Sequence, residues 1–199
     1  MADQPDAVVG LVERADAPPE VQAAFDSGAA QYGKLLNTWR ALANRPEIFV
    51  AYLPYLRSVV GPGALDQRLK ELVQVRVVLL NHCRYSVSHR VRSAKAAGVP
   101  EEELVAVARG ELGGFSDREQ VALQYASELT VKPPTVAYAD EPGGIDPELV
   151  ARLRETFDDA ELVELTATIG LWNALARFHR ALRLELDMDP PPAAIDALL

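Results

Sequence analysis

The sequence predicts an all-α protein, a bundle of about eight helices in a single domain. Apolar residues recur at helical spacing along most of the chain, and no two neighbouring segments show the alternation of a convincing strand pair. Glycine and proline gather in short clusters that separate these segments, whereas residues 64–97 contain neither. With 199 residues, the chain is long enough to bury a sizeable core, and short connections then favour a helical bundle.

The composition is that of a globular protein, with 49% hydrophobic and 25% charged residues. The formal net charge is −9, so phosphate backbones and anionic lipid repel the chain, and we expect neither nucleic acid nor a membrane as a partner. No apolar run approaches the roughly 20 residues that span a bilayer, and the N-terminal residues lack a signal-peptide pattern. The single cysteine cannot form an intrachain disulfide, and a free thiol without an export signal predicts a cytoplasmic location.

Residues 1–19 are predicted to form an N-terminal arm, residues 20–188 the helical domain and residues 189–199 a proline-rich tail. Prolines and capping residues followed by acidic residues predict helix starts at residues 18–20, 44–47, 100–103, 116–119 and 146–148. Residues 132–144 are predicted to be a loop, and the last long helix runs from near Asp158 to about Leu186. The apolar residues of the tail either dock on a neighbour or fray.

The segment 64–97 is predicted to be helical, with Asp66 as its N-cap and Gly98 at its end. Residues 72–79 alternate as a strand would, but the length without a breaker and the helix-forming residues before them favour helix. The segment forms either one long helix or two helices joined near Asn81. Residues 66–72 and Asn81 also resemble residues 159–165 and Asn173, so either a two-helix unit is duplicated or two amphipathic helices are merely similar.

The chemistry is expected between Glu71 and Arg92. On a helix, residues three apart share a face, so Cys83, Ser86 and His89 form one row with Arg90 beside it. A thiol beside an imidazole and guanidinium groups has a lowered pKa and becomes a nucleophile. Glu71, 12 residues before Cys83, can orient the histidine or take its proton only if the helix breaks or another chain supplies it. The alternative interpretation is that Cys83 is a small buried hydrophobic residue.

This order of residues resembles the carboxymuconolactone decarboxylase family, which includes the alkylhydroperoxidase D-like proteins. Glu71, Cys83 and His89 are followed by a basic, alanine-rich stretch and an acidic helix start. Residues 36–47, 115–126 and 169–178 are similar to other segments of the family. The resemblance implies an all-helical fold and a homo-oligomer, usually a trimer or a hexamer, with a dimer as a further option. In the redox branch of the family, the second cysteine of a C-x-x-C motif attacks peroxide and the first resolves it.

The sequence departs from that redox pattern. Ser86 stands at the position of the attacking cysteine, and Cys83 matches the resolving one. Arg90 stands where the family usually has histidine, and His89 lies one residue earlier. A serine hydroxyl does not reduce a peroxide, and one cysteine cannot store the oxidation as an intrachain disulfide. A two-cysteine redox cycle is therefore excluded by composition.

Three functions remain open. The first is a non-redox, decarboxylase-like lyase acting on a small organic molecule, in which Arg84 or Arg90 binds a carboxylate and His89 or Glu71 delivers a proton. The second is a one-cysteine thiol peroxidase, with Cys83 as nucleophile. The third is a catalytically degenerate member that binds a ligand or partner.

The candidate site follows from these hypotheses. The expected catalytic residues are Glu71, Cys83, Ser86 and His89, and the expected substrate-binding residues are His82, Arg84, Arg90, Asn173 and Arg177. Asn173 and Arg177 are neighbours on the last helix, where a buried polar anchor is the alternative interpretation. We expect no metal and no other cofactor, because His82 and His89 lie about 10 Å apart along a helix.

Overall fold

A computed structural model of the chain describes residues 7–131 and 144–199. Within these ranges the chain is all-helical and contains no strand, which confirms the predicted fold class. Eight of the α-helices have seven or more residues, and two short 3-10 helices lie at Arg14–Asp16 and Leu112–Gly114. The α-helices are α1 (Pro19–Tyr32), α2 (Asn37–Leu42), α3 (Pro46–Val60), α4 (Gln67–Leu80), α5 (Arg84–Ala96), α6 (Glu101–Arg109), α7 (Asp117–Val131), α8 (Pro147–Thr156), α9 (Asp159–Ala181) and α10 (Ala193–Asp196).

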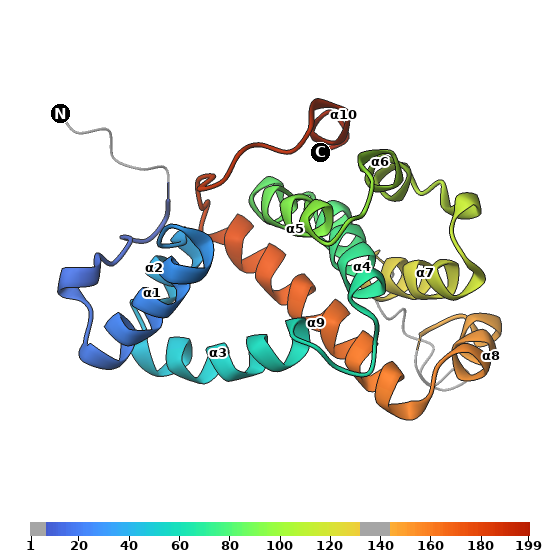
Figure 1. Cartoon of the computed structure of the whole chain (residues 1–199), viewed down its shortest axis with the longest axis horizontal. Helices are drawn as coiled ribbons and strands as arrows, with labels where there is room; N and C mark the ends of the chain where they lie inside the picture. The colour runs from blue at the N-terminus through green and yellow to red at the C-terminus, as the bar shows by residue number, and fades with distance from the viewer. Residues whose placement is uncertain (1–6, 132–143) are drawn as a thin grey trace.

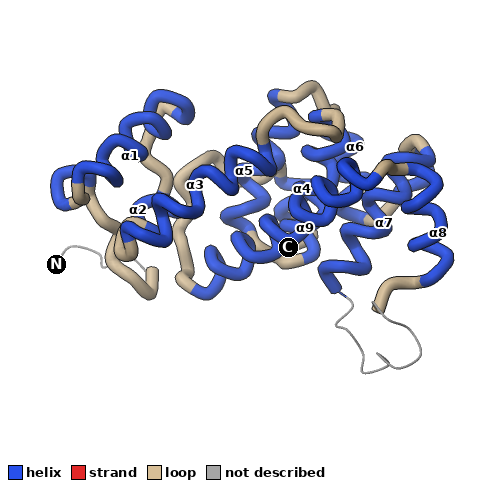
Figure 2. Tube along the Cα trace, turned by 90° about the horizontal axis from the view of Figure 1, so that it is seen from below, coloured by secondary structure: helices blue, strands red, loops and turns tan. Residues whose placement is uncertain are grey.

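Helices α4 and α9 form the centre of the molecule (Figure 1). Helix α4 packs against α5, α6, α7 and α9, while α9 also packs against α3 and α5. Helices α1 and α2 lie at one end and α8 at the other, as Figure 2 shows. Helix α5 packs against both central helices, and α3 connects the end formed by α1 and α2 to α9.

Helix α4 is central because almost every residue from Leu69 to Leu79 is buried. A helix that is packed on all sides needs no polar face, so its sequence lacks the usual helical alternation of apolar and polar residues. This explains why residues 72–79 show a pattern that resembles a strand. Asp66 caps the helix by accepting a hydrogen bond from Leu69 N at 2.8 Å, as predicted. Lys70 is fully buried and is paired with Glu164 and with the carbonyl of Val59.

The predicted helical segment consists of two helices joined near Asn81. His82 adopts a positive φ of 47° in the turn, and Cys83 is the N-cap of α5. The chain thus reverses, and α5 packs back along α4. Asn81 Nδ2 donates to Asn173 Oδ1 at 2.9 Å, so the two similar segments meet at their matching asparagines.

The last long helix is shorter than expected. It ends at Ala181, a turn follows at Leu182 and Arg183, where Arg183 has a positive φ of 52°, and the chain from Leu184 returns across α5 to α10 (Figure 1). A backbone hydrogen bond joins this turn to the N-terminal segment, because Val8 N donates to Leu182 O at 2.9 Å. Helix α10 docks on α6 of the same chain with Ile195 fully buried, so this part of the tail does not fray.

The predicted loop 132–144 lies outside the described residues except for Gly144. None of the helices in the described part of the chain is long and apolar enough to cross a bilayer.

Candidate active site

A cavity of about 70 Å³ lies between α2, α3, α5 and α9. Its apolar wall includes two tryptophans, two tyrosines and several aliphatic side chains. Polar side chains gather on the remaining wall, and these are Thr38, Tyr85, Ser86, His89, Arg90 and His179. A more open outer pocket of about 340 Å³ adjoins it, and Tyr32, Val60, His89 and Arg90 line both spaces.

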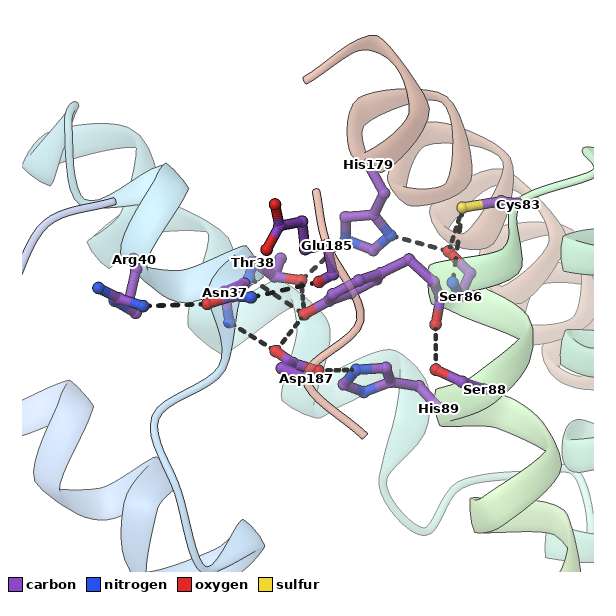
Figure 3. Close-up of polar contacts among 11 residues, drawn as sticks. Asn37, Thr38, Arg40, Cys83, Ser86, Ser88, His89, His179, Glu185 and Asp187 are labelled. Atoms are coloured by element: carbon purple, nitrogen blue, oxygen red, sulfur yellow. Dashed lines mark hydrogen bonds and ion pairs between the residues drawn. The ribbon is translucent and has the colours of Figure 1, made fainter. Parts of the chain in front are cut away.

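His89 is paired with a carboxylate from the C-terminal segment. Its Nε2 lies 2.6 Å from Asp187 Oδ1, and each side chain is only 8% exposed. Asp187 Oδ2 also accepts from the Tyr85 hydroxyl and from Asn37 N, both at 2.6 Å (Figure 3). Burial acts to raise the pKa of Asp187, but the hydrogen bonds from His89, Tyr85 and Asn37 outweigh it and hold this pKa below its usual value. The carboxylate therefore fixes the imidazole in one orientation.

A hydrogen-bonded chain continues from Tyr85 into the core (Figure 3). Thr38 donates to the Tyr85 oxygen from its backbone N and its hydroxyl, at 3.2 and 3.1 Å. Thr38 Oγ1 lies 2.9 Å from His179 Nε2, and His179 Nδ1 lies 2.8 Å from Ser86 Oγ. Ser86 Oγ in turn lies 3.1 Å from Cys83 Sγ. Ser86 is thus paired with His179, whereas His89 is paired with Asp187.

The environment of Cys83 differs from the expected one. Its side chain is buried, it is not among the residues that line the cavity, and burial raises the pKa of its thiol. The expectation of a lowered pKa was wrong, because the arginine and imidazole expected beside the thiol are elsewhere. Arg84 points outward to Asp196, and His89 contacts Asp187.

His179 is a buried imidazole that was not predicted to belong to the site. Burial lowers its pKa to about 3, with a further lowering by the nearby charge of His89. Asp187 opposes this shift and Arg90 adds to it. His179 is therefore neutral near pH 7 and serves as a fixed hydrogen-bonding group.

Glu71 reaches α5 because the helix breaks at Asn81, but it meets different partners from those expected. Ser93 Oγ donates to Glu71 Oε1 at 2.8 Å, and Gln67 Nε2 donates to the same oxygen at 2.9 Å. Glu71 Oε2 lies 3.9 Å from Arg90 Nη1. Glu71 is thus not the carboxylate that orients His89, because Asp187 occupies that position.

Of the five expected substrate-binding residues, only Arg90 lines the cavity. His82 is exposed in the turn, and Arg84 forms a two-bond pair with Asp196 at 2.7 and 2.9 Å. Asn173 is a buried anchor that bonds Asn81 and Thr130, while Arg177 on the same helix is exposed. Across residues 7–131 and 144–199, no three metal-binding side chains are arranged to hold an ion.

Four residues of the site were not predicted from the sequence, namely Thr38, Tyr85, His179 and Asp187. Tyr85 lies inside the motif between Cys83 and Ser86, and Thr38 lies in the stretch 36–47 that carries part of the resemblance. For Asp187 the signal was the strict alternation of apolar and charged residues over 182–189, a period typical of extended chain.

Comparison with known proteins supports this fold. A structure from Ralstonia eutropha JMP134, of a peroxidase-related protein with an alkylhydroperoxidase AhpD core, has a TM-score of 0.76 at 18% identity and covers 97% of this chain and 96% of that one. The debrominase Bmp8, solved as a cysteine-to-alanine variant with 2,3,4-tribromopyrrole, has a TM-score of 0.76 at 19% identity, with 98% and 97% of the two chains covered. At these identities the likeness shows the alkylhydroperoxidase D-like fold.

Sequence comparison identifies the family. YnjA of Escherichia coli (strain K12) is 34% identical over 155 residues, which cover 76% of this chain and 79% of YnjA. The model of the carboxymuconolactone decarboxylase family matches residues 46–128, which include the α4–α5 hairpin and its cavity-lining side chains. The chain therefore belongs to the carboxymuconolactone decarboxylase family.

Proposed function

We propose that this protein is a non-redox, lyase-type enzyme that acts on a small organic molecule, with His89 as its general acid and base. One observation carries the proposal: His89 lines the cavity while Asp187 holds its Nε2 at 2.6 Å. Among the described residues, His89 Nδ1 has no hydrogen-bond partner, so this nitrogen is free to exchange a proton with a molecule in the cavity. Asp187 is the positioning residue, because its hydrogen bond holds the imidazole in one orientation.

A decarboxylase-like step suits this arrangement. The bond between the substrate carbon and its carboxylate breaks, carbon dioxide leaves, and the electron pair remains on the carbon. His89 Nδ1–H then protonates that carbon, and the imidazolium becomes neutral while Nε2–H stays bonded to Asp187. The step is complete without an oxidant, a reductant or a second thiol.

The one-cysteine peroxidase has less support, because Cys83 does not line the cavity and burial raises the pKa of its thiol. A binding protein without catalysis would have the same cavity but no use for the His89–Asp187 pair. The debrominase neighbour supports small-molecule chemistry on this fold, since its crystal structure holds a brominated pyrrole.

The test is a panel of small carboxylic acids, including carboxylated lactones, with carbon dioxide release as the measurement. For any acid that is turned over, His89→Gln is expected to lower kcat/KM by about 100-fold or more. His82→Gln is the matched control, because His82 is exposed in the turn, and it should change kcat/KM by less than about twofold. Undiminished turnover in His89→Gln would remove His89 from the mechanism. Peroxide consumption that is lost in Cys83→Ala, without lyase activity, would instead support the peroxidase.

A further inference from the structure

Ser86 and His179 form a pair in the cavity that the proposed lyase step does not use. Ser86 Oγ lies 2.8 Å from His179 Nδ1, and His179 Nε2 lies 2.9 Å from Thr38 Oγ1 (Figure 3). All three side chains line the inner cavity. A serine becomes a nucleophile when its hydroxyl is bonded to an imidazole and a third group orients that imidazole. The three residues have this arrangement.

The hydrogens of this chain of bonds are assigned from its ionised end. The lowered pKa of Asp187 makes it a carboxylate near neutral pH, so it only accepts, and the Tyr85 hydroxyl donates to it at 2.6 Å. The Thr38 hydroxyl donates to the Tyr85 oxygen at 3.1 Å. Thr38 has no second hydroxyl hydrogen, so its Oγ1 accepts the hydrogen of His179 Nε2.

This assignment leaves His179 Nδ1 as an acceptor. The ring is neutral near pH 7, because burial lowers its pKa to about 3, so it carries one hydrogen, on Nε2, and a lone pair on Nδ1. The Ser86 hydroxyl donates to that lone pair, since Cys83 Sγ at 3.1 Å is a weaker acceptor. Ser86 also lies in the first turn of α5, where the helix dipole favours negative charge on its oxygen. Ser86 therefore has both a neutral base for its proton and a favourable field for its oxygen.

We infer that Ser86 is a nucleophile for acyl transfer, with His179 as its general base, and that the protein cleaves esters of short-chain acids. The Ser86 oxygen attacks the ester carbonyl carbon while its proton moves to His179 Nδ1. The bond from that carbon to the leaving oxygen then breaks, and Nδ1–H protonates the alcohol, so an acyl-serine ester remains. Water attacks this ester in the same way, the acid is released, and the proton returns to the Ser86 oxygen.

The space around Ser86 limits the acyl group. The inner cavity has about 70 Å³, whereas a cavity of about 150 Å³ holds benzene. An acetyl group is smaller than benzene and fits there, while the leaving group lies in the adjoining outer pocket of about 340 Å³. Thr38 is uncharged, so it stabilises the imidazolium less than the carboxylate of a Ser-His-Asp triad does. We therefore expect slow turnover and a preference for activated esters, whose leaving groups need no proton.

Methanesulfonyl fluoride is the covalent probe, because its sulfonyl group is small and forms a stable ester with serine. The Ser86 oxygen displaces fluoride from sulfur, and its proton leaves through His179. Peptide mass spectrometry is expected to find one methanesulfonyl group on Ser86 and none on Ser88, which is also buried on α5 but does not line the inner cavity. An unlabelled Ser86, with or without a label on Cys83 or Ser88, overturns the inference.

Para-nitrophenyl acetate gives the rate, because release of nitrophenolate is followed by its absorbance. Ser86→Ala and His179→Gln should each lower kcat/KM by at least about 100-fold. Ser88→Ala is the matched control and should change kcat/KM by less than about twofold, since the Ser88 hydroxyl bonds to the Tyr85 carbonyl. Circular dichroism checks the fold of each variant. Equal rates in wild type and Ser86→Ala overturn the inference.

Thr38 is a positioning residue, because it holds His179 through Nε2 and does not itself react. Thr38→Val removes the acceptor at nearly equal shape and should lower kcat by at least about tenfold, with KM changed by less than about twofold. Thr38→Ser keeps the hydroxyl and should restore at least about half of the wild-type kcat. Wild-type kcat in Thr38→Val would overturn the inference that a ring held by Thr38 is the base.

Discussion

His89 Nε2 lies 2.6 Å from Asp187 Oδ1, although the two residues are 98 positions apart in the chain. They meet because α9 ends at Ala181 and the following residues return across α5. The same carboxylate accepts hydrogen bonds from Tyr85 on α5 and from Asn37 at the start of α2. Asp187 therefore joins three parts of the fold at one point, and its ionisation contributes both to stability and to the orientation of His89.

Replacing Asp187 by asparagine should reduce stability in a pH-dependent way. The folded-state pKa of Asp187 is lowered, so its stabilising contribution is present above the unfolded pKa of about 3.9 and is lost as the pH falls through the folded value. At pH 7 we expect Asp187→Asn to lower the free energy of unfolding by about 2 kcal/mol, and the difference from wild type should shrink below about pH 4. Urea unfolding at several pH values measures this.

Asp189→Asn is the control for that experiment, because Asp189 lies two residues away and is exposed. Its free energy of unfolding should match that of the wild type at every pH. A constant difference between Asp187→Asn and wild type from pH 7 to pH 3 would contradict the assigned role of the carboxylate.

His179 should remain neutral across the physiological range. Burial, together with the nearby charge of His89, lowers its pKa to about 3. A lowered folded pKa means that the unfolded chain takes up a proton at about pH 6.5 while the folded chain does not, so stability falls as the pH falls below that value. Wild-type protein should lose up to about 1.4 kcal/mol of unfolding free energy per pH unit there through this residue.

The chain has three histidines, so ring NMR signals can report this directly. We expect the His179 signals to stay constant between pH 8 and pH 5. In His179→Gln the decline in stability between pH 6.5 and pH 4 should be smaller than in the wild type. A His179 titration midpoint near 6.5 would show that the ring is not held in the buried, neutral state.

Local sequence signals were sufficient for much of the fold. Asp66 and Asp146 cap helices as predicted, and the break near Asn81 was one of the two alternatives for residues 64–97. These features depend on neighbouring residues, so the sequence contains the necessary information. The end of α9 has no such local signal, because no glycine or proline occurs between Gly170 and Pro190. The turn that ends the helix is bonded instead to a distant part of the chain, since Val8 N donates to Leu182 O.

The site was less predictable, because its pairs come from distant segments. Ser86 contacts Cys83 at the start of α5, but Ser86 also pairs with His179, whereas His89 pairs with Asp187. The prediction that Arg84 lies beside the Cys83 thiol was wrong, because its guanidinium pairs with Asp196 of α10. A one-dimensional pattern gives the face of a helix, whereas the residue opposite that face is set by tertiary packing.

Cys83 is expected to be an unreactive thiol in the folded protein. It is buried behind Ser86, and burial raises its pKa, so little thiolate is present at neutral pH. An aromatic disulfide reagent at pH 7.5 should label the native protein at least about 100-fold more slowly than the urea-unfolded protein. Mass spectrometry after modest peroxide should find Cys83 still as a thiol. Rapid native labelling, or a sulfenic acid at Cys83, would revive the peroxidase hypothesis.

Replacing Ser86 by cysteine should create a disulfide with Cys83. Ser86 Oγ already lies 3.1 Å from Cys83 Sγ, and the turn before α5 holds the two residues together. With hydrogen peroxide as oxidant, the two thiols give up two hydrogens and two electrons, and the peroxide is reduced to two water molecules. Mass spectrometry should show the loss of two hydrogens, reversed by dithiothreitol. Ser88→Cys is the matched control, because the Ser88 hydroxyl bonds to the Tyr85 carbonyl rather than to Cys83, and it should keep both thiols. Two free thiols in folded, peroxide-treated Ser86→Cys would show that the first turn of α5 does not hold these side chains in contact.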